Sequence, residues 1–181
     1  MTKIISGISL LALMLSFWGC SSSIGEEDVF INQLGKEVRL DDFKGKVVLM
    51  NFVYTSCPNR GCEQMALQFL RLQLLMKDVF GKDLYLLSVS IDPDKDSQAV
   101  LKEYARKMKA DSRGWLFLTA KPSVAERIGK KHGVEWKTDP DGTRRHKVVV
   151  KLIDRKGDVK AIYEDLDTPV EKMMKDITKL L

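Results

Sequence analysis

The 181-residue sequence predicts an α/β fold of three layers, in which helices cover both faces of a mixed central sheet. Two continuous apolar runs, residues 47–54 and 84–91, have the length and composition of strands that are buried on both faces. Each run is followed by a segment with helical signals, and the chain closes on a hairpin pattern and a last helix. Hydrophobic residues at 44% and charged residues at 30% are typical of one globular domain and exclude a disordered chain.

The first half of the domain is predicted to supply most of the sheet. Its expected elements are, in order, short strands over 29–34 and 36–40, a loop over 41–46, a buried strand from 47, a helix over 62–79 and a buried strand over 84–91. Gly35 and Gly81 mark a turn and a helix end, because glycine adopts positive φ without steric cost. Residues 92–97, Asp92-Pro93-Asp94-Lys95-Asp96-Ser97, precede the next helix and are predicted to cap it. The acids Asp92, Asp94 and Asp96 also raise the question of a hard-metal site. We interpret them as capping residues, because a calcium site needs a fuller set of oxygen ligands.

The second half is predicted to complete the sheet and cover it. Its expected elements are, in order, a helix up to 109, a strand over 115–118, a helix over 122–131 closed by Gly133, a turn over 139–142, hairpin strands over 147–153 and 159–163, and a final helix. Thr168, Pro169 and Glu171 predict the start of that helix, as N-cap, first helical residue and capping-box partner. Strands and helices that alternate before a closing hairpin are typical of a thioredoxin-like sandwich.

The segment before the domain is predicted to be an export signal and a tether. Residues 1–19 carry one positive charge before an apolar run that is shorter than the ~20 residues needed to span a bilayer. The run ends at Gly19-Cys20, which resembles a bacterial lipobox, so that cleavage after Gly19 leaves Cys20 as a lipidated N-terminus. A plain signal peptide or an uncleaved anchor is the alternative. Residues 20–27 then form a polar tether, and the domain spans 28–181.

This leader places the domain outside the cytoplasm, on the periplasmic or cell-surface side, with the lipid on Cys20 as its membrane anchor. The net charge of +5 and the pI near 9.0 raise the question of nucleic acid binding. Lysines and arginines are scattered among aspartates and glutamates, however, and no basic stripe is interleaved with aromatic residues. We therefore expect a solvated basic surface and no nucleic acid partner.

Cys57 and Cys62 lie where the first buried strand ends and the next helix begins. With the leader cysteine assigned to a lipid, they form the one thiol pair of an exported protein. Residues five apart on a straight helix point about 140° away from each other. Pro58, Asn59 and Gly61 instead favour a loop that brings the two sulfurs together, with Cys62 in the first turn of the helix.

The position of the pair at a helix N-terminus predicts a lowered thiol pKa, and Cys57, at the strand end, is expected to be the more reactive cysteine if its sulfur meets the helix N-terminus and solvent. A lowered pKa favours the thiolate, the form that attacks disulfides and binds metals. The alternative is a static disulfide between Cys57 and Cys62. A disulfide across so short a loop removes little conformational entropy from the unfolded chain, which argues against this alternative.

The chain resembles the Sco (SenC/PrrC) family over about residues 30–163, on the strength of three segments and one histidine. These are 45–58, similar to the family's strand and first cysteine; 90–96, similar to its Ser-x-Asp-Pro-x-x-Asp segment; 115–119, similar to its Trp/Phe-x-x-Leu-Thr strand; and His146, shortly before 152–157. His146 matches the position of the family's copper-binding histidine. In one respect the chain departs from the family, because four residues separate its cysteines where three are usual.

Members of the Sco family are copper proteins tied to the maturation of cytochrome c oxidase. The resemblance implies copper, as Cu(I) or Cu(II), bound by Cys57, Cys62 and His146, because thiolates suit Cu(I) and an imidazole also suits Cu(II). It implies a metallochaperone more than an enzyme. The partner would be the copper-site subunit of cytochrome c oxidase, or another copper or thiol protein.

An extracytoplasmic thiol–disulfide oxidoreductase without stable copper binding is the alternative, with Cys57 and Cys62 as its redox pair. Thioredoxin-type reductases have two residues between their cysteines and a cis-proline before the strand that ends in Leu-Ile-Asp. Val148 occupies that position here, which disfavours a general reductase. A peroxiredoxin is disfavoured because Thr55 lies two residues, not three, before Cys57. His132, at a helix end, is interpreted as favouring the helix dipole and not as a ligand.

Overall fold

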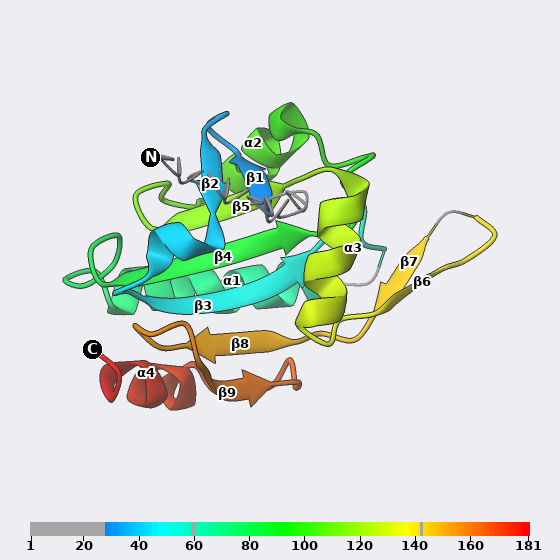
Figure 1. Cartoon of the computed structure of the whole chain (residues 1–181). Coiled ribbons are helices and arrows are strands. Elements are labelled where there is room, and N and C mark those ends of the chain that lie inside the picture. The colour runs from blue at the N-terminus through cyan, green and yellow to red at the C-terminus, as the bar shows by residue number, and fades with distance from the viewer. Residues whose placement is uncertain (1–27, 59–60, 142) are drawn as a thin grey trace, which may run out of the picture.

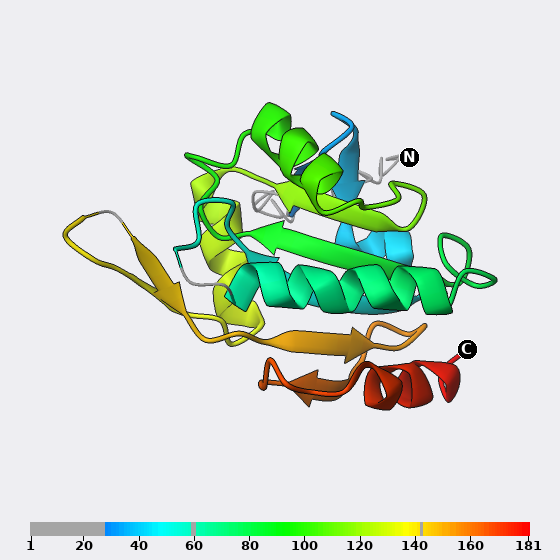
Figure 2. The ribbon, with the colours of Figure 1, turned by 180° about the vertical axis from the view of Figure 1, so that it is seen from behind.

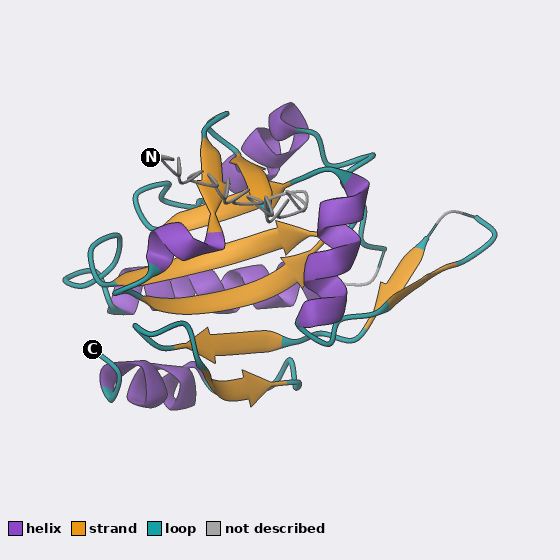
Figure 3. Cartoon of the chain, viewed as in Figure 1, coloured by secondary structure: helices purple, strands orange, loops and turns teal. Residues whose placement is uncertain are grey.

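A computed structural model describes residues 28–58, 61–141 and 143–181 and shows a seven-stranded mixed sheet in the order β2-β1-β5-β4-β3-β8-β9 (Figures 1 and 3). The sheet strands are β1 (Val29–Asn32), β2 (Glu37–Arg39), β3 (Val47–Val53), β4 (Leu84–Ser90), β5 (Trp115–Thr119), β8 (Val150–Ile153) and β9 (Val159–Tyr163). A separate two-stranded sheet pairs β6 (Trp136–Thr138) with β7 (Arg144–His146). The helices are the 3₁₀ helix η1 (Leu40–Phe43) and the α-helices α1 (Gly61–Leu75), α2 (Gln98–Lys107), α3 (Pro122–Lys131) and α4 (Val170–Thr178).

Strand β3 lies inside the sheet, next to the central strand β4, and all seven of its residues are buried. It pairs in parallel with β4, from Val47 opposite Leu84 to Val53 opposite Ser90. On its other side it pairs antiparallel with β8, so that Asn51 lies opposite Val150. The carboxyl ends of β3 and β4 and the amino end of β8 therefore meet at one edge of the sheet. The loops that carry the predicted site residues leave from this edge.

The helices form the two outer layers of the sandwich. Helices α1, α2 and α4 cover one face, and α3 and η1 lie over the other (Figures 1 and 2). Successive side chains of a strand point to opposite faces of the sheet, so alternate residues belong to two separate apolar clusters. Leu49 packs with Phe69 of α1 and Met173 of α4, whereas Met50 belongs to the cluster that contains Ile128 of α3. The predicted α/β sandwich with a mixed sheet is confirmed.

Several predicted boundaries differ from the structure. Residues 40–43 form η1 where a loop was expected, and α1 is regular only to Leu75. The last helix has Pro169 as its N-cap without a side-chain hydrogen bond, so the N-cap predicted at Thr168 was wrong by one position. Strand β8 begins at Val150, later than expected, and the β6–β7 hairpin was not predicted. No helix in the described part of the chain combines the length and the apolar content needed to cross a bilayer.

Candidate functional site

The two cysteines lie at the edge of the sheet where β3 ends. Cys57 is half-buried in the loop after β3, and Cys62 is 5% exposed in the first turn of α1. Both are free thiols, and their side chains are hydrogen-bonded to each other. The loop therefore brings the sulfurs together despite the extra residue between them, as Pro58 and Gly61 predicted.

The protonation of Cys62 differs from the prediction. Its hydrogen bond to Cys57 and its burial raise the pKa of the Cys62 thiol, although it lies at a helix N-terminus. Burial disfavours a charged thiolate, and a second thiolate on Cys57 repels it, so these effects exceed that of the helix dipole. The pair therefore consists of a more accessible thiol, Cys57, and a buried thiol that holds its proton.

His146 lines the same cavity as the two cysteines. This cavity, the dithiol cavity, has a volume of about 240 Å³ and is lined by Tyr54, Cys57, Gly61, Cys62, Arg144, His146, Val148 and Leu166. His146 is the last residue of β7, whereas the sequence predicted that it directly precedes a strand over 147–153. Its Nδ1 lies 3.0 Å from the Lys147 carbonyl oxygen, and burial lowers the pKa of its imidazole. The imidazole is thus held in its neutral form, which is the form that binds a metal.

The donor set of the dithiol cavity suits copper, because two thiols and an imidazole are soft or borderline ligands. Within the described residues, however, no group of three or more His, Cys, Asp or Glu side chains is close enough to hold a metal ion. The structure therefore places the three predicted residues around one cavity without setting them at ligand distances. Val148, at the position of the missing proline, also lines this cavity, and no cis peptide bond occurs among the described residues.

The thiols also border a second cavity, on the side of α2. It has a volume of about 140 Å³, and Tyr104 and Lys107 of α2 line it together with Thr55, Cys57 and Cys62. The dithiol is accordingly reached from two directions, one beside His146 and one beside α2.

Two buried acids next to the site were assigned wrongly from the sequence. Asp96 is fully buried and accepts hydrogen bonds from Thr55 Oγ1 and Ser90 Oγ, both at 2.6 Å. Asp92, which is 2% exposed, forms an ion pair with Arg144. Neither caps α2, because that role belongs to Ser97, whose Oγ accepts from the Val100 amide at 3.4 Å.

Asp96 fixes the turn that leads from β3 to Cys57. Its carboxylate also accepts from the Thr55 amide at 3.2 Å, and burial raises the pKa of Asp96. Burial of a carboxylate is costly unless hydrogen bonds compensate for the lost hydration, and Thr55 and Ser90 supply them. A carboxylate at the carboxyl edge of a buried strand, close in sequence to the site, is the signal that the capping interpretation overlooked.

Tyr54 and Arg144 were not identified from the sequence. The Tyr54 hydroxyl donates a hydrogen bond to the Arg144 carbonyl oxygen, and the Tyr54 ring meets the His146 ring edge-on with centroids 5.9 Å apart. Burial and the neighbouring Cys57 raise the pKa of Tyr54. This tyrosine therefore links the end of β3 to the strand that carries His146.

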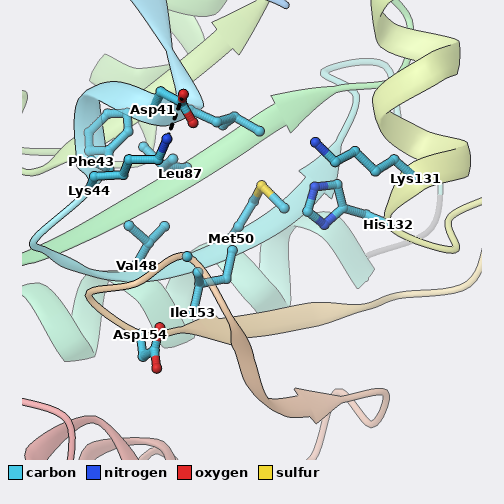
Figure 4. Close-up of a pocket in the computed structure, with 12 residues that line it drawn as sticks. Asp41, Phe43, Lys44, Val48, Met50, Leu87, Lys131, His132, Ile153 and Asp154 are labelled. Atoms are coloured by element: carbon cyan, nitrogen blue, oxygen red, sulfur yellow. Dashed lines mark hydrogen bonds and ion pairs between the residues drawn. The ribbon is translucent and has the colours of Figure 1, made fainter.

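His132 lines a different cavity, of about 150 Å³, between η1 and α3 (Figure 4). Val48, Met50 and Leu87 form its apolar floor, and neither cysteine lines it. The His132 Nε2 is buried without a hydrogen-bond partner, and burial lowers the pKa of His132 to about 4. A neutral imidazole carries no charge to interact with the helix dipole, so the predicted dipole role of His132 was wrong.

Comparison with known proteins identifies relatives along the whole domain. The sequence model described as SCO1/SenC matches residues 21–181. A structure of a SCO1/SenC family lipoprotein from Bacillus anthracis is 30% identical, with a TM-score of 0.76 over 84% of this chain and 91% of that one. BsSco, described as a member of the Sco family of cytochrome c oxidase assembly proteins with a disulfide switch, is 26% identical, with a TM-score of 0.70 over 84% and 90% of the two chains.

A structure of ScoI from Bradyrhizobium japonicum with copper bound is 24% identical, with a TM-score of 0.73 over 84% of this chain and 96% of that one. At this identity the similarity shows a shared fold. Together these structures confirm the thioredoxin-like sandwich. Cys20 and the tether lie outside the described residues, so the predicted lipid anchor remains a prediction.

Proposed function

Because this chain belongs to the SCO1/SenC family, we propose that it is an exported, membrane-anchored copper-binding protein that serves the assembly of cytochrome c oxidase. The observation that carries this proposal is the dithiol cavity, where Cys57, Cys62 and His146 line one space. The copper bound to the related ScoI and the assembly role of the related BsSco support it.

Each of the three side chains would supply one ligand to the copper ion. Cys57 and Cys62 would supply thiolate ligands, and binding releases their protons. His146 would supply a neutral imidazole, which its lowered pKa keeps deprotonated near neutral pH. Thiolates favour Cu(I), and the imidazole adds more to the binding of Cu(II). Because the three groups are not at ligand distances, His146 and the thiols must approach each other when copper binds.

An extracytoplasmic thiol–disulfide oxidoreductase is the second candidate, favoured by the hydrogen-bonded pair of free thiols and supported by the disulfide switch of BsSco. In this reaction the Cys57 thiolate attacks a partner disulfide, and the partner's first sulfur leaves as a thiolate. The Cys62 thiolate then attacks the Cys57 sulfur of the mixed disulfide, and the second partner thiolate leaves. Two electrons pass to the partner, and the two protons of the dithiol are released.

A lipid on Cys20 would hold the domain at the membrane surface. The sequence Gly19-Cys20 followed by a polar tether supports this, as does the description of the related Bacillus anthracis protein as a lipoprotein. The partner would then be the copper-site subunit of cytochrome c oxidase or another copper or thiol protein at the same membrane.

Anaerobic copper titration of the reduced full-length chain in detergent tests the proposal. One Cu(I) or one Cu(II) per chain is expected, and none once Cys57 and Cys62 form a disulfide. The C57A variant should lose both ions, and H146A should lose more affinity for Cu(II) than for Cu(I). H132A is the matched control, because His132 lines a different cavity. If the reduced chain takes up no copper while its thiols react normally, the oxidoreductase takes the place of the chaperone.

A further inference from the structure

His146 lies on a part of the chain that the main sheet does not hold. Among the described residues, strands β6 and β7, here called the β6–β7 arm, pair only with each other, and they project from one end of the sandwich (Figures 1 and 2). His146 lies opposite Trp136 in this pairing, at the base of the arm. The position of the imidazole therefore depends on the contacts that fix the base of the arm to the domain.

Arg144 provides the charged contacts at this base. Its Nη1 donates a hydrogen bond to the Ile91 carbonyl oxygen at 2.5 Å, and its Nη2 lies 3.2 Å from Asp92 Oδ1. The Arg144 side chain is 18% exposed and that of Asp92 is 3% exposed. Its guanidinium also lies 5.7 Å from the centre of the Trp136 ring, which is within cation–π range. One side chain thus joins the end of β4 to both strands of the arm.

Backbone and ring contacts complete the attachment. The Tyr54 hydroxyl donates to the Arg144 carbonyl oxygen, and the Tyr54 ring contacts His146. Arg145, the next residue, differs from Arg144 in its exposure and in its partner. It is 77% exposed and pairs with Asp139, so it does not connect the arm to the sheet.

We propose that Arg144 is a positioning residue that latches the β6–β7 arm to Asp92 and Ile91, and so holds His146 at the dithiol cavity. The inference rests on the proposed function, in which His146 is a copper ligand. A ligand that is held near its place loses little conformational freedom when the metal binds, whereas a ligand on a loose arm loses more. Partners behind a metal ligand commonly change metal affinity by about 10–100-fold when removed.

Four variants of the full-length chain test the latch. R144A removes the contacts to Asp92 and Ile91, and R144K keeps the positive charge but not the fork of donors that joins both. Y54F removes the hydroxyl that bonds to the Arg144 carbonyl without leaving a buried charge unpaired. R145A is the matched control, because it removes an arginine from the same strand whose ion pair, with Asp139, stays within the arm.

Two readouts apply to each variant. Hydrogen exchange of the β6 and β7 amides, measured without copper, reports whether the arm opens. The affinities for Cu(II) and Cu(I) report whether His146 still reaches the site. R144A should speed exchange in the arm and weaken Cu(II) binding about tenfold, with a smaller change for Cu(I). R144K and Y54F should fall between R144A and the wild type, and R145A should match the wild type.

The outcomes separate the latch from the proposed function. If R144A and Y54F exchange in the arm at the wild-type rate, the latch is wrong, whatever copper does. If the wild-type chain binds no copper, the proposed function fails, and faster arm exchange in R144A still supports the latch. If Cu(II) binding falls in R144A and R145A alike, the effect is one of charge, and the positioning role of Arg144 is overturned. Circular dichroism checks that each variant is folded.

Discussion

Cys57, in the loop after β3, and Cys62, in the first turn of α1, differ in their exposure. Both thiols border the same two cavities, but Cys57 is half-buried, whereas Cys62 is 5% exposed and belongs to the apolar cluster on the α3 face. Position at the helix terminus predicted a lowered pKa for the pair, with Cys57 as the more reactive thiol. Burial and the neighbouring sulfur override that position at Cys62.

We predict that Cys57 reacts with alkylating reagents before Cys62 does. At neutral pH the raised pKa of Cys62 keeps it protonated, and its side chain is shielded, so iodoacetamide should label Cys57 at least about tenfold faster. Mass spectrometry of peptides from a short labelling reaction measures the ratio. Equal labelling of both cysteines would contradict the assignment of separate roles.

His132 should make the protein less stable in mild acid. The pKa of His132 is about 4 in the folded state and about 6.5 in the unfolded chain, so below pH 6.5 the unfolded chain binds the extra proton first. The free energy of unfolding therefore falls as the pH drops from 6.5 to 4. Lys131 and Lys151 add to the effect, and Asp28 opposes it.

The free energy of unfolding of the H132Q variant should fall much less over this pH range. Between pH 7 and pH 4.5 the wild type should lose about 1–2 kcal/mol more than H132Q, a figure reduced for the partial exposure of the ring. Urea unfolding of both proteins at the two pH values gives this difference. An identical loss in the two proteins would show that His132 titrates normally.

Helix α3 packs closely against the base of the β6–β7 arm at Gly129. A Cβ on Gly129 would lie 2.5 Å from the Trp136 ring and 2.9 Å from the Val134 carbonyl oxygen. The absence of a side chain at this helical position thus lets β6 approach α3. The contact belongs to two elements that are adjacent in the chain, and it adds to the attachment made by Arg144.

We expect G129A to destabilise the protein, although alanine is the better helix former by about 1 kcal/mol. The contact with backbone cannot be relieved by a rotamer change, so a net loss of about 1–3 kcal/mol is expected. Urea unfolding measures the loss, and Trp136 fluorescence reports a shift of the arm. K130A, at the exposed neighbouring position, should stay within about 0.5 kcal/mol of the wild type. A gain in stability for G129A would mean that α3 and β6 are not in contact.

At the scale of elements, the sequence revealed the strands of the main sheet and missed the two strands of the β6–β7 arm outside it. The central strands β3 and β4 were predicted because burial on both faces requires continuous apolar runs. Strands β6 and β7 consist of Trp136-Lys137-Thr138 and Arg144-Arg145-His146, which carry no such run. Their position is fixed by Arg144 and Tyr54 through partners that are distant in sequence, which local patterns do not reveal. The cysteine pair was found because its signal is local, at a strand-to-helix junction.

The whole molecule is expected to be held at a membrane by its N-terminus. Mass spectrometry of the mature protein should show a first residue, Cys20, carrying a diacylglyceryl group and an N-terminal acyl group, because more than one chain is needed for stable anchoring. The C20A variant should appear in the soluble fraction or keep its leader. A mature wild-type chain that begins after another residue and carries no lipid would rule out the anchor.

The pairing of β3 has a consequence for when the protein folds. Strand β3 is formed by residues early in the domain, yet one of its two neighbours, β8, comes from the last quarter, with Asn51 opposite Val150. When the chain emerges with its N-terminus first, one side of β3 has no partner strand until β8 and β9 have also emerged. Such long-range pairing delays folding, because the intervening chain must first be closed into a loop. In the export that the leader predicts, this delay would keep the domain unfolded until nearly all of it has crossed the membrane.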